Sequence, residues 1–175
     1  MKKLAILLLS TLSAGLNAET SISHSETFIS ADTSVALAQS TLAHCKRAGF
    51  PVAVSVVDSR AQIKAVIVAE GAFPHAIDTS LRKAKTAASR RMPTHIISKE
   101  NAHEPELALA FHSIGLTSLG GGIPITYQGE VIGGIGVAGA PGEDSEGREH
   151  DLTCLEHAFR DSKLEWLSDV YALRD

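Results

Sequence analysis

The sequence predicts an α+β domain with antiparallel strands, and two observations support this prediction. Apolar, strand-like runs occur in two pairs, residues 52–58 with 63–69 and residues 123–127 with 131–138, and a short turn joins each pair. Segments with helical spacing of apolar residues precede, separate and follow these pairs. Strands joined by tight turns pair antiparallel, so helices should cover one or both faces of the sheet.

The first 18 residues have the pattern of a secretory signal peptide and should lie outside the fold. A short basic start precedes the apolar residues 4–12, and Ala18 offers a small residue for cleavage. This segment is too short for a spanning helix, and we expect no stable membrane insertion. Residues 19–30 are polar and serine-rich and should form a flexible leader. The mature protein is therefore expected to be periplasmic or secreted.

The charge and length of the remaining chain limit its partners and its number of domains. Lys2 and Lys3 are two of the 16 basic residues, so cleavage would leave 14 against 20 acidic residues and a formal net charge of −6. Such a balance argues against nucleic acid or an anionic membrane as the main partner. We expect one domain over residues 31–165, long enough to bury a core, followed by a C-terminal tail over residues 166–175.

The first helix should span residues 33–48, with Ser30 or Asp32 as its cap. Four of its residues recur at intervals of three and four and predict a buried stripe: Val35, Ala38, Leu42 and Cys45. Gly49 would end the helix. The strand pair that follows has no glycine in its turn, where Arg60 and Ala61 stand instead.

Three further helices are expected. One should begin near Pro74 and continue to Arg90, with an inward side made of Ile77, Leu81, Ala84 and Ala88. Pro93 is expected to end the segment that contains this helix. A weaker helix should cover residues 105–114, and a last one residues 148–163.

Glycines frame the second strand pair. Gln128 and Gly129 supply the positive φ that a two-residue turn needs. Alternation along the return strand gives two faces, one with Val131, Ile135 and Val137 and the other with Ile132, Gly134, Gly136 and Ala138. The second face is nearly bare beyond its first residue, which lets a helix or a flat ligand approach the backbone. A ligand there would make Gly121 and Gly122 contact candidates.

Cys45 and Cys154 are the two cysteines, and an even pair in an oxidising compartment predicts a disulfide. In the chain-entropy model, closing a loop of about 110 residues would contribute about 4–5 kcal/mol. The alternative is a metal site. His150, Cys154 and His157 share one face of the last helix at spacings that suit Zn²⁺.

Two histidines and a basic helix are the other candidates for ligand contacts. His75 lies at a helix N-terminus, where the dipole disfavours a cation, so a neutral imidazole could ligate a transition metal. His112 follows Phe111 and would be partly buried. Lys83 belongs to a basic helix that could pair with ligand carboxylates. An ordinary surface or packing role is the alternative for each residue.

Known catalytic and nucleotide-binding motifs do not occur in the sequence. There is no nucleophile elbow, phosphate loop, CxxC pair or dinucleotide fingerprint. No set of acid, base and nucleophile is visible either. The sequence therefore favours a binding protein over an enzyme.

The chain resembles the GlcG/HbpS family, which is related to the C-terminal domain of PduO and is described as haem-binding or haem-degrading. The resemblance covers about residues 30–162. It rests on residues 51–58, on Lys83-Ala84 with Thr86-Ala87, and most specifically on the glycine-framed segment 120–142.

The resemblance implies a profilin-like fold, an antiparallel sheet with the first and last helices on one side. That arrangement would bring Cys45 near Cys154. It also implies homo-oligomers, and exported members are similar to extracytoplasmic haem-binding proteins that act beside a sensor system. A haem or related tetrapyrrole ligand is therefore expected. The alternative is an enzyme or binding protein for a small hydroxy-acid or carbonyl compound.

The chain departs from its relatives at two places. Relatives commonly have glycine in the first hairpin turn, where this chain has Arg60-Ala61. They usually carry small or aliphatic residues around Phe73-Pro74-His75. His75, the candidate for an iron ligand, is therefore either peculiar to this chain or a ligand gained here.

Overall fold

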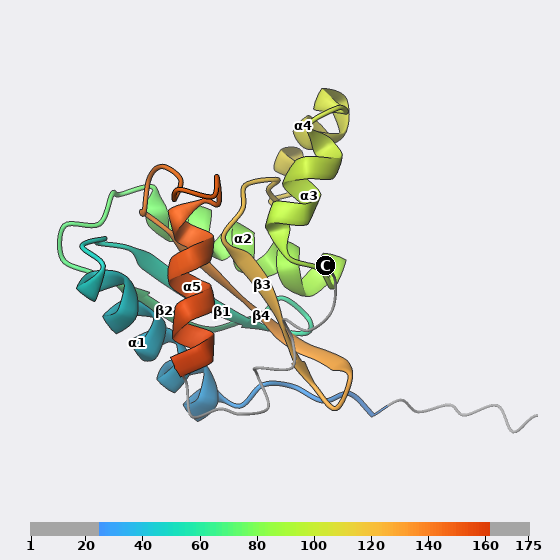
Figure 1. Cartoon of the computed structure of the whole chain (residues 1–175). Helices are drawn as coiled ribbons and strands as arrows, with labels where there is room; N and C mark the ends of the chain where they lie inside the picture. The colour runs from blue at the N-terminus through green and yellow to red at the C-terminus, as the bar shows by residue number, and fades with distance from the viewer. Residues whose placement is uncertain (1–24, 162–175) are drawn as a thin grey trace, which may run out of the picture.

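A computed structural model describes residues 25–161 and shows one antiparallel sheet between two layers of helix (Figure 1). The strand order is β2-β1-β4-β3, and every neighbouring pair is antiparallel. The strands are β1 (Ala53–Asp58), β2 (Ile63–Val68), β3 (Gly122–Tyr127) and β4 (Glu130–Ala138). The predicted α+β class and antiparallel pairing are confirmed.

Helices α1 (Ala31–Arg47) and α5 (His150–Asp161) lie together on one face of the sheet, as the resemblance implied. The main core fills the space between them and the strands, with Val54 and Ile135 from the sheet and Leu155 from α5 fully buried. The predicted disulfide joins the two helices, with 5.3 Å between the Cα atoms of Cys45 and Cys154.

Ser30 is the N-cap of α1, and its hydroxyl accepts a hydrogen bond from the Thr33 N–H at 3.1 Å. The prediction that Val35 lies on the buried stripe of this helix is wrong, because Val35 is 40% exposed. The buried side of the helix is instead rotated toward two hydroxyl residues, and consists of Ser34, Leu37, Ala38, Thr41 and Cys45. Apolar spacing could not identify the two hydroxyl residues as inward.

Helix α2 (Ala76–Arg90) covers the opposite face and packs on the glycines of β4. A Cβ at Gly134 would collide with the Ala84 carbonyl oxygen, and one at Gly136 with that of Ser80. Helix packing, rather than ligand contact, therefore explains the bare face. Ile77, expected on the inward side, is 45% exposed.

A bulge changes the faces expected for β4. The register between β3 and β4 shifts between Ile125 and Thr126, whose partners are Gly133 and Val131, so Ile132 is the extra residue. Ile132 consequently joins the main core with Ile135 instead of lying on the glycine face.

Both hairpin turns hold residues with positive φ. Gln128 and Gly129 join β3 to β4 at φ values of 51° and 82°, as predicted. In the first hairpin, whose turn contains no glycine, Ala61 adopts a φ of 60°. The chain keeps the turn by accepting a left-handed alanine.

The end of the predicted leader is attached to the domain. Ile29 is buried in the main core, and its N–H donates to the Ile132 carbonyl at 3.0 Å. Glu26 pairs with Arg60 at 2.7 Å. The end of the segment expected to be a flexible leader therefore contacts the domain at these two residues.

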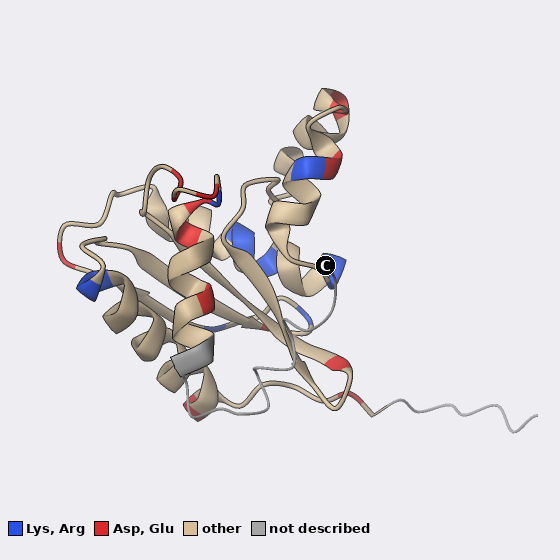
Figure 2. Cartoon of the chain, in the orientation of Figure 1, with Lys and Arg blue, Asp and Glu red and all other residues tan. Residues whose placement is uncertain are grey.

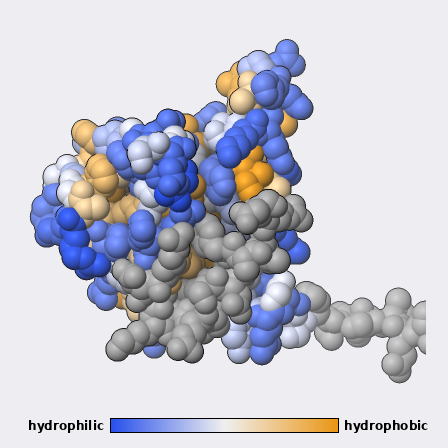
Figure 3. Space-filling view, in the orientation of Figure 1, coloured by the Kyte–Doolittle hydropathy of each residue, from blue (hydrophilic) through white to orange (hydrophobic). Residues whose placement is uncertain are grey.

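One helix was not predicted. Pro93 was expected to close the α2 region, but it is the N-cap of α3 (Thr94–Asn101), since proline is compatible with a helix start. The predicted helix over residues 105–114 is α4 (Pro105–Ser113). Together α3 and α4 project from the sheet as an arm with apolar surface, where Leu109 is 71% exposed (Figures 1 and 3).

Several expectations fall outside residues 25–161. They are the signal peptide, the first part of the leader, the last residues of the final helix and the tail over residues 166–175. None of the helices within residues 25–161 has the length and apolar character needed to cross a bilayer.

The packing of α2 on β4 predicts that Gly136→Ala is severely destabilising. The added methyl group would meet backbone atoms, which cannot rotate away, so the free energy of unfolding should fall by about 3 kcal/mol. Urea denaturation measures this change. Gly115→Ala is the control, because its φ is 81° but it has open space around it, and strain alone should cost about 1–2 kcal/mol. A smaller loss for Gly136→Ala than for the control would contradict the packing argument.

His95 on α3 predicts a dependence of stability on pH. Burial and the nearby charge of Lys99 lower the pKa of His95 from its ordinary value of 6.5. The unfolded chain therefore binds a proton that the folded chain does not. Above pH 6.5 His95 is neutral in both states and does not lower the free energy of unfolding. As the pH falls from 6.5 toward the pKa of the folded state, protonation of the unfolded chain lowers the free energy of unfolding.

Urea denaturation from about pH 7.5 to about pH 5.5 should show a larger loss of stability for the natural protein than for His95→Gln, which cannot titrate. Equal losses in the two proteins would show that His95 does not carry this dependence.

Candidate functional site

A cleft of about 330 Å³ opens beside α2 where β4 leads into the loop before α5. Its lining comes from the segment around the start of α2, from residues 138–142 and from the start of α5. Two of the predicted ligand residues, His75 and Lys83, lie in this lining.

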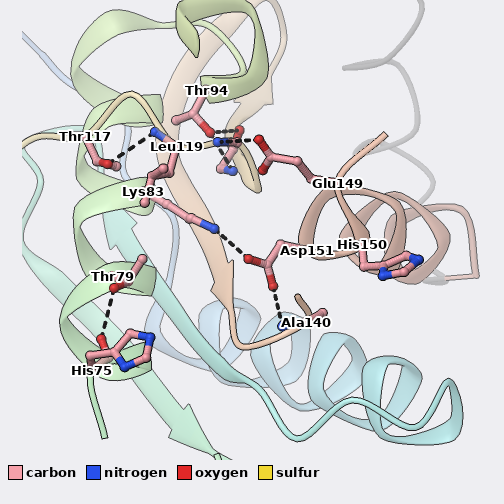
Figure 4. Close-up of polar contacts among 12 residues, drawn as sticks. His75, Thr79, Lys83, Thr94, Thr117, Leu119, Ala140, Glu149, His150 and Asp151 are labelled. Atoms are coloured by element: carbon pink, nitrogen blue, oxygen red, sulfur yellow. Dashed lines mark hydrogen bonds and ion pairs between the residues drawn. The ribbon is translucent and has the colours of Figure 1, made fainter. Parts of the chain in front are cut away.

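Helix α2 presents a row of polar side chains to the cleft. His75, Thr79 and Lys83 are spaced by four residues and so lie on one side of the helix (Figure 4). His75 is the N-cap residue, and its carbonyl accepts a hydrogen bond from the Thr79 hydroxyl at 3.0 Å. The His75 ring is stacked on that of Phe73, with centroids 5.7 Å apart. The imidazole is thereby held, exposed, at the mouth of the cleft.

A buried ion pair forms the floor of the cleft. Lys83 Nζ donates to Asp151 Oδ2 at 2.7 Å, and the Ala140 N–H donates to Asp151 Oδ1 at 2.8 Å (Figure 4). The Lys83 side chain is 3% exposed and that of Asp151 13%. Both carboxylate oxygens are thus occupied, and the pair joins helices on opposite faces of the sheet.

The glycines at the start of the hairpin support this floor and do not line the cleft. Gly121 has a φ of 97°, and a Cβ there would lie 2.7 Å from Asp151 Cβ and 3.1 Å from Lys83 Nζ. The Gly122 N–H donates to the Thr94 hydroxyl at 2.8 Å. These positions need glycine because the ion pair and α2 occupy the space of a side chain.

Glu149 lines the cleft beside the ion pair. Its Oε1 accepts a hydrogen bond from the Gly120 N–H at 3.3 Å. The loop before it is ordered by Asp144, whose Oδ1 accepts the N–H groups of Glu146 and Arg148. The hydrogen bond from the Arg148 backbone is the main cause that lowers the pKa of Asp144 from its ordinary value.

His112 is not brought to the cleft. It lies exposed on α4, and its carbonyl accepts a hydrogen bond from Arg82 at 3.2 Å. The structure thus separates it from His75 and Lys83, which the sequence had grouped with it as candidates.

The alternative metal site on α5 is not assembled, because the disulfide holds the Cys154 sulfur. His150 Nδ1 lies 2.9 Å from the Pro141 carbonyl oxygen, and the His157 ring is stacked on His44. Within residues 25–161 no three side chains of His, Cys, Asp or Glu are grouped as a metal site.

Sequence reasoning missed Glu149 and Asp151. The available signal was a pair of acidic residues at the start of a helix, directly after a glycine-rich loop. Such acids usually serve only to complement the helix dipole. The partner of Asp151 lies 68 positions away on another helix, and helical spacing contains no information about that contact.

A protein-family model described as haem-degrading, HbpS-like matches residues 29–147. An uncharacterised 15.0 kDa protein from the dhaT-dhaS intergenic region of Citrobacter freundii is 35% identical over 109 residues. That alignment covers 59% of this chain and 74% of the relative.

Solved structures show the same fold. A double mutant of HbpS from Streptomyces reticuli is 27% identical, with a TM-score of 0.67 over 88% of this chain and 95% of that one. The complex of PduOC with haem is 23% identical, with a TM-score of 0.66 over 78% of this chain and 96% of that one. The second likeness is evidence for the fold alone.

The buried pair predicts strong energetic coupling between α2 and α5. Lys83→Met or Asp151→Asn alone should lower the free energy of unfolding by about 3–5 kcal/mol, since each leaves a buried charge unpaired. The double variant should lose less than the sum of the two, with a coupling energy of about 1–3 kcal/mol.

Urea denaturation of the four proteins measures this cycle. Lys85→Met, two positions along the same helix and only partly buried, is the matched control and should cost less than about 1 kcal/mol. Additive losses in the cycle would show that the pair does not hold the floor together.

Proposed function

Because the chain belongs to the family of haem-degrading, HbpS-like proteins, we propose that it binds haem or a related tetrapyrrole in the cleft beside α2. The observation that supports this most is the exposed His75 imidazole at the mouth of the cleft, stacked on Phe73. An imidazole beside an aromatic surface provides a nitrogen for iron and an apolar wall for a flat ring.

The residues present fit an iron porphyrin. Phe73 and Leu119 supply exposed apolar surface at the cleft, and its volume lies at the lower end of the range for ligand sites of about 300–1,000 Å³. His75 would hold the iron, and the apolar residues would contact the ring. When bound, haem would supply a redox-active metal centre. His112, outside the cleft, has no part in this proposal.

We further propose that the protein is exported and takes part in haem handling or sensing. The basic start and apolar stretch of residues 1–18 support export. The apolar arm formed by α3 and α4 is consistent with assembly into homo-oligomers, since exposed apolar surface of this kind is typical of interaction sites. The sequence resemblance supports the same role.

Titration of the purified protein with hemin tests the binding proposal. A shift of the Soret band that saturates at one hemin per chain is expected. His75→Ala should weaken binding by at least about tenfold, because even outer-shell partners of metal ligands contribute about 10–100-fold. His112→Ala is the matched control and should bind as the natural protein does. Absence of any Soret shift at stoichiometric hemin would refute haem binding.

A further inference from the structure

We propose that the cleft excludes anionic groups, so that it accepts the uncharged ring of its ligand and leaves the ligand's carboxylates in solvent. This inference rests on the proposed binding of an iron porphyrin. It adds an orientation, in which both carboxylate side chains of the porphyrin point out of the cleft.

The first argument is the charge of the lining. Among the described residues that line the cleft, Lys83 is the one lysine or arginine, and two carboxylates, Asp151 and Glu149, stand beside it. Lys83 is already paired with Asp151 at 2.7 Å and its side chain is 3% exposed. A ligand carboxylate could gain this cation only by separating a buried ion pair, which leaves Asp151 unpaired.

The second argument is the helix end that faces the cleft. The N-terminus of a helix carries a partial positive charge and ordinarily attracts anions. Here two of the chain's own acids add negative charge near this helix end. Asp151 lies in the first turn of α5 and accepts the Ala140 N–H, and Glu149 directly precedes the helix. Figure 2 shows acidic residues along this loop and first turn.

The third argument is the position of the apolar surface. Phe73 is 48% exposed and Leu119 50%, and both line the cleft. A flat ring can therefore lie against apolar groups while the charge of Glu149 repels its carboxylates. The lining thus separates the two parts of an amphipathic ligand.

Comparison of hemin with its dimethyl ester tests the orientation, because esterification removes both carboxylate charges and keeps the ring and iron. Both ligands are titrated against the natural protein in the same dilute detergent and followed by the Soret band. We expect the two dissociation constants to agree within about threefold. An ester that binds at least about tenfold more weakly would overturn the inference, since protein cations would then hold the carboxylates.

Failure of the proposed function gives a different result, because then neither ligand shifts the Soret band. Glu149→Lys provides a second test. Replacing a repelling acid by a cation should raise the affinity for hemin relative to the ester by about fivefold or more. An unchanged ratio in this variant would contradict the role of Glu149 in excluding carboxylates. Glu149→Gln is the matched control and should change the ratio by a smaller amount in the same direction.

Discussion

The close approach of α2 to the glycine face of β4 is the contact on which the rest of the structure depends. At Gly134 and Gly136 the helix backbone occupies the space that a methyl group would need. Because the helix lies so near the sheet, Lys83 can extend past Gly121 to Asp151 on the opposite layer. The same placement brings His75 to the mouth of the cleft.

The two layers of helix are held together by different chemistry at different places. On one face, α1 and α5 share an apolar core and the disulfide between Cys45 and Cys154. At the end of the sheet, the ion pair of Lys83 with Asp151 connects α5 to α2. Position 151 is one turn from position 154, so the start of α5 is fixed from both sides. A rigid cleft floor follows from this double attachment.

Local patterns in the sequence predicted most of the fold. Periodicity and turn residues correctly predicted both hairpins and the bare glycine face, and Ser30 was one of the two caps expected for α1. The disulfide was predicted from the even number of cysteines. Errors occurred where the deciding contact is distant or where one residue shifts the register. Because of a bulge, Ile132 lies on the opposite face of β4 from the one predicted. The buried side of α1 contains the hydroxyl residues Ser34 and Thr41 and does not include Val35, which had been predicted there. For the site, His75 and Lys83 were predicted from their helix, whereas Glu149 and Asp151 could be found only in three dimensions.

The ion pair of the cleft floor also determines when the cleft can be complete during synthesis. Its two members lie 68 positions apart, and Asp151 belongs to the last helix of the described chain. Contacts of such long sequence separation form slowly, because a long loop has to be closed before they are made. A growing chain that already displays His75 therefore has no complete cleft. For the proposed tetrapyrrole ligand, capture would therefore be postponed until α5 has docked.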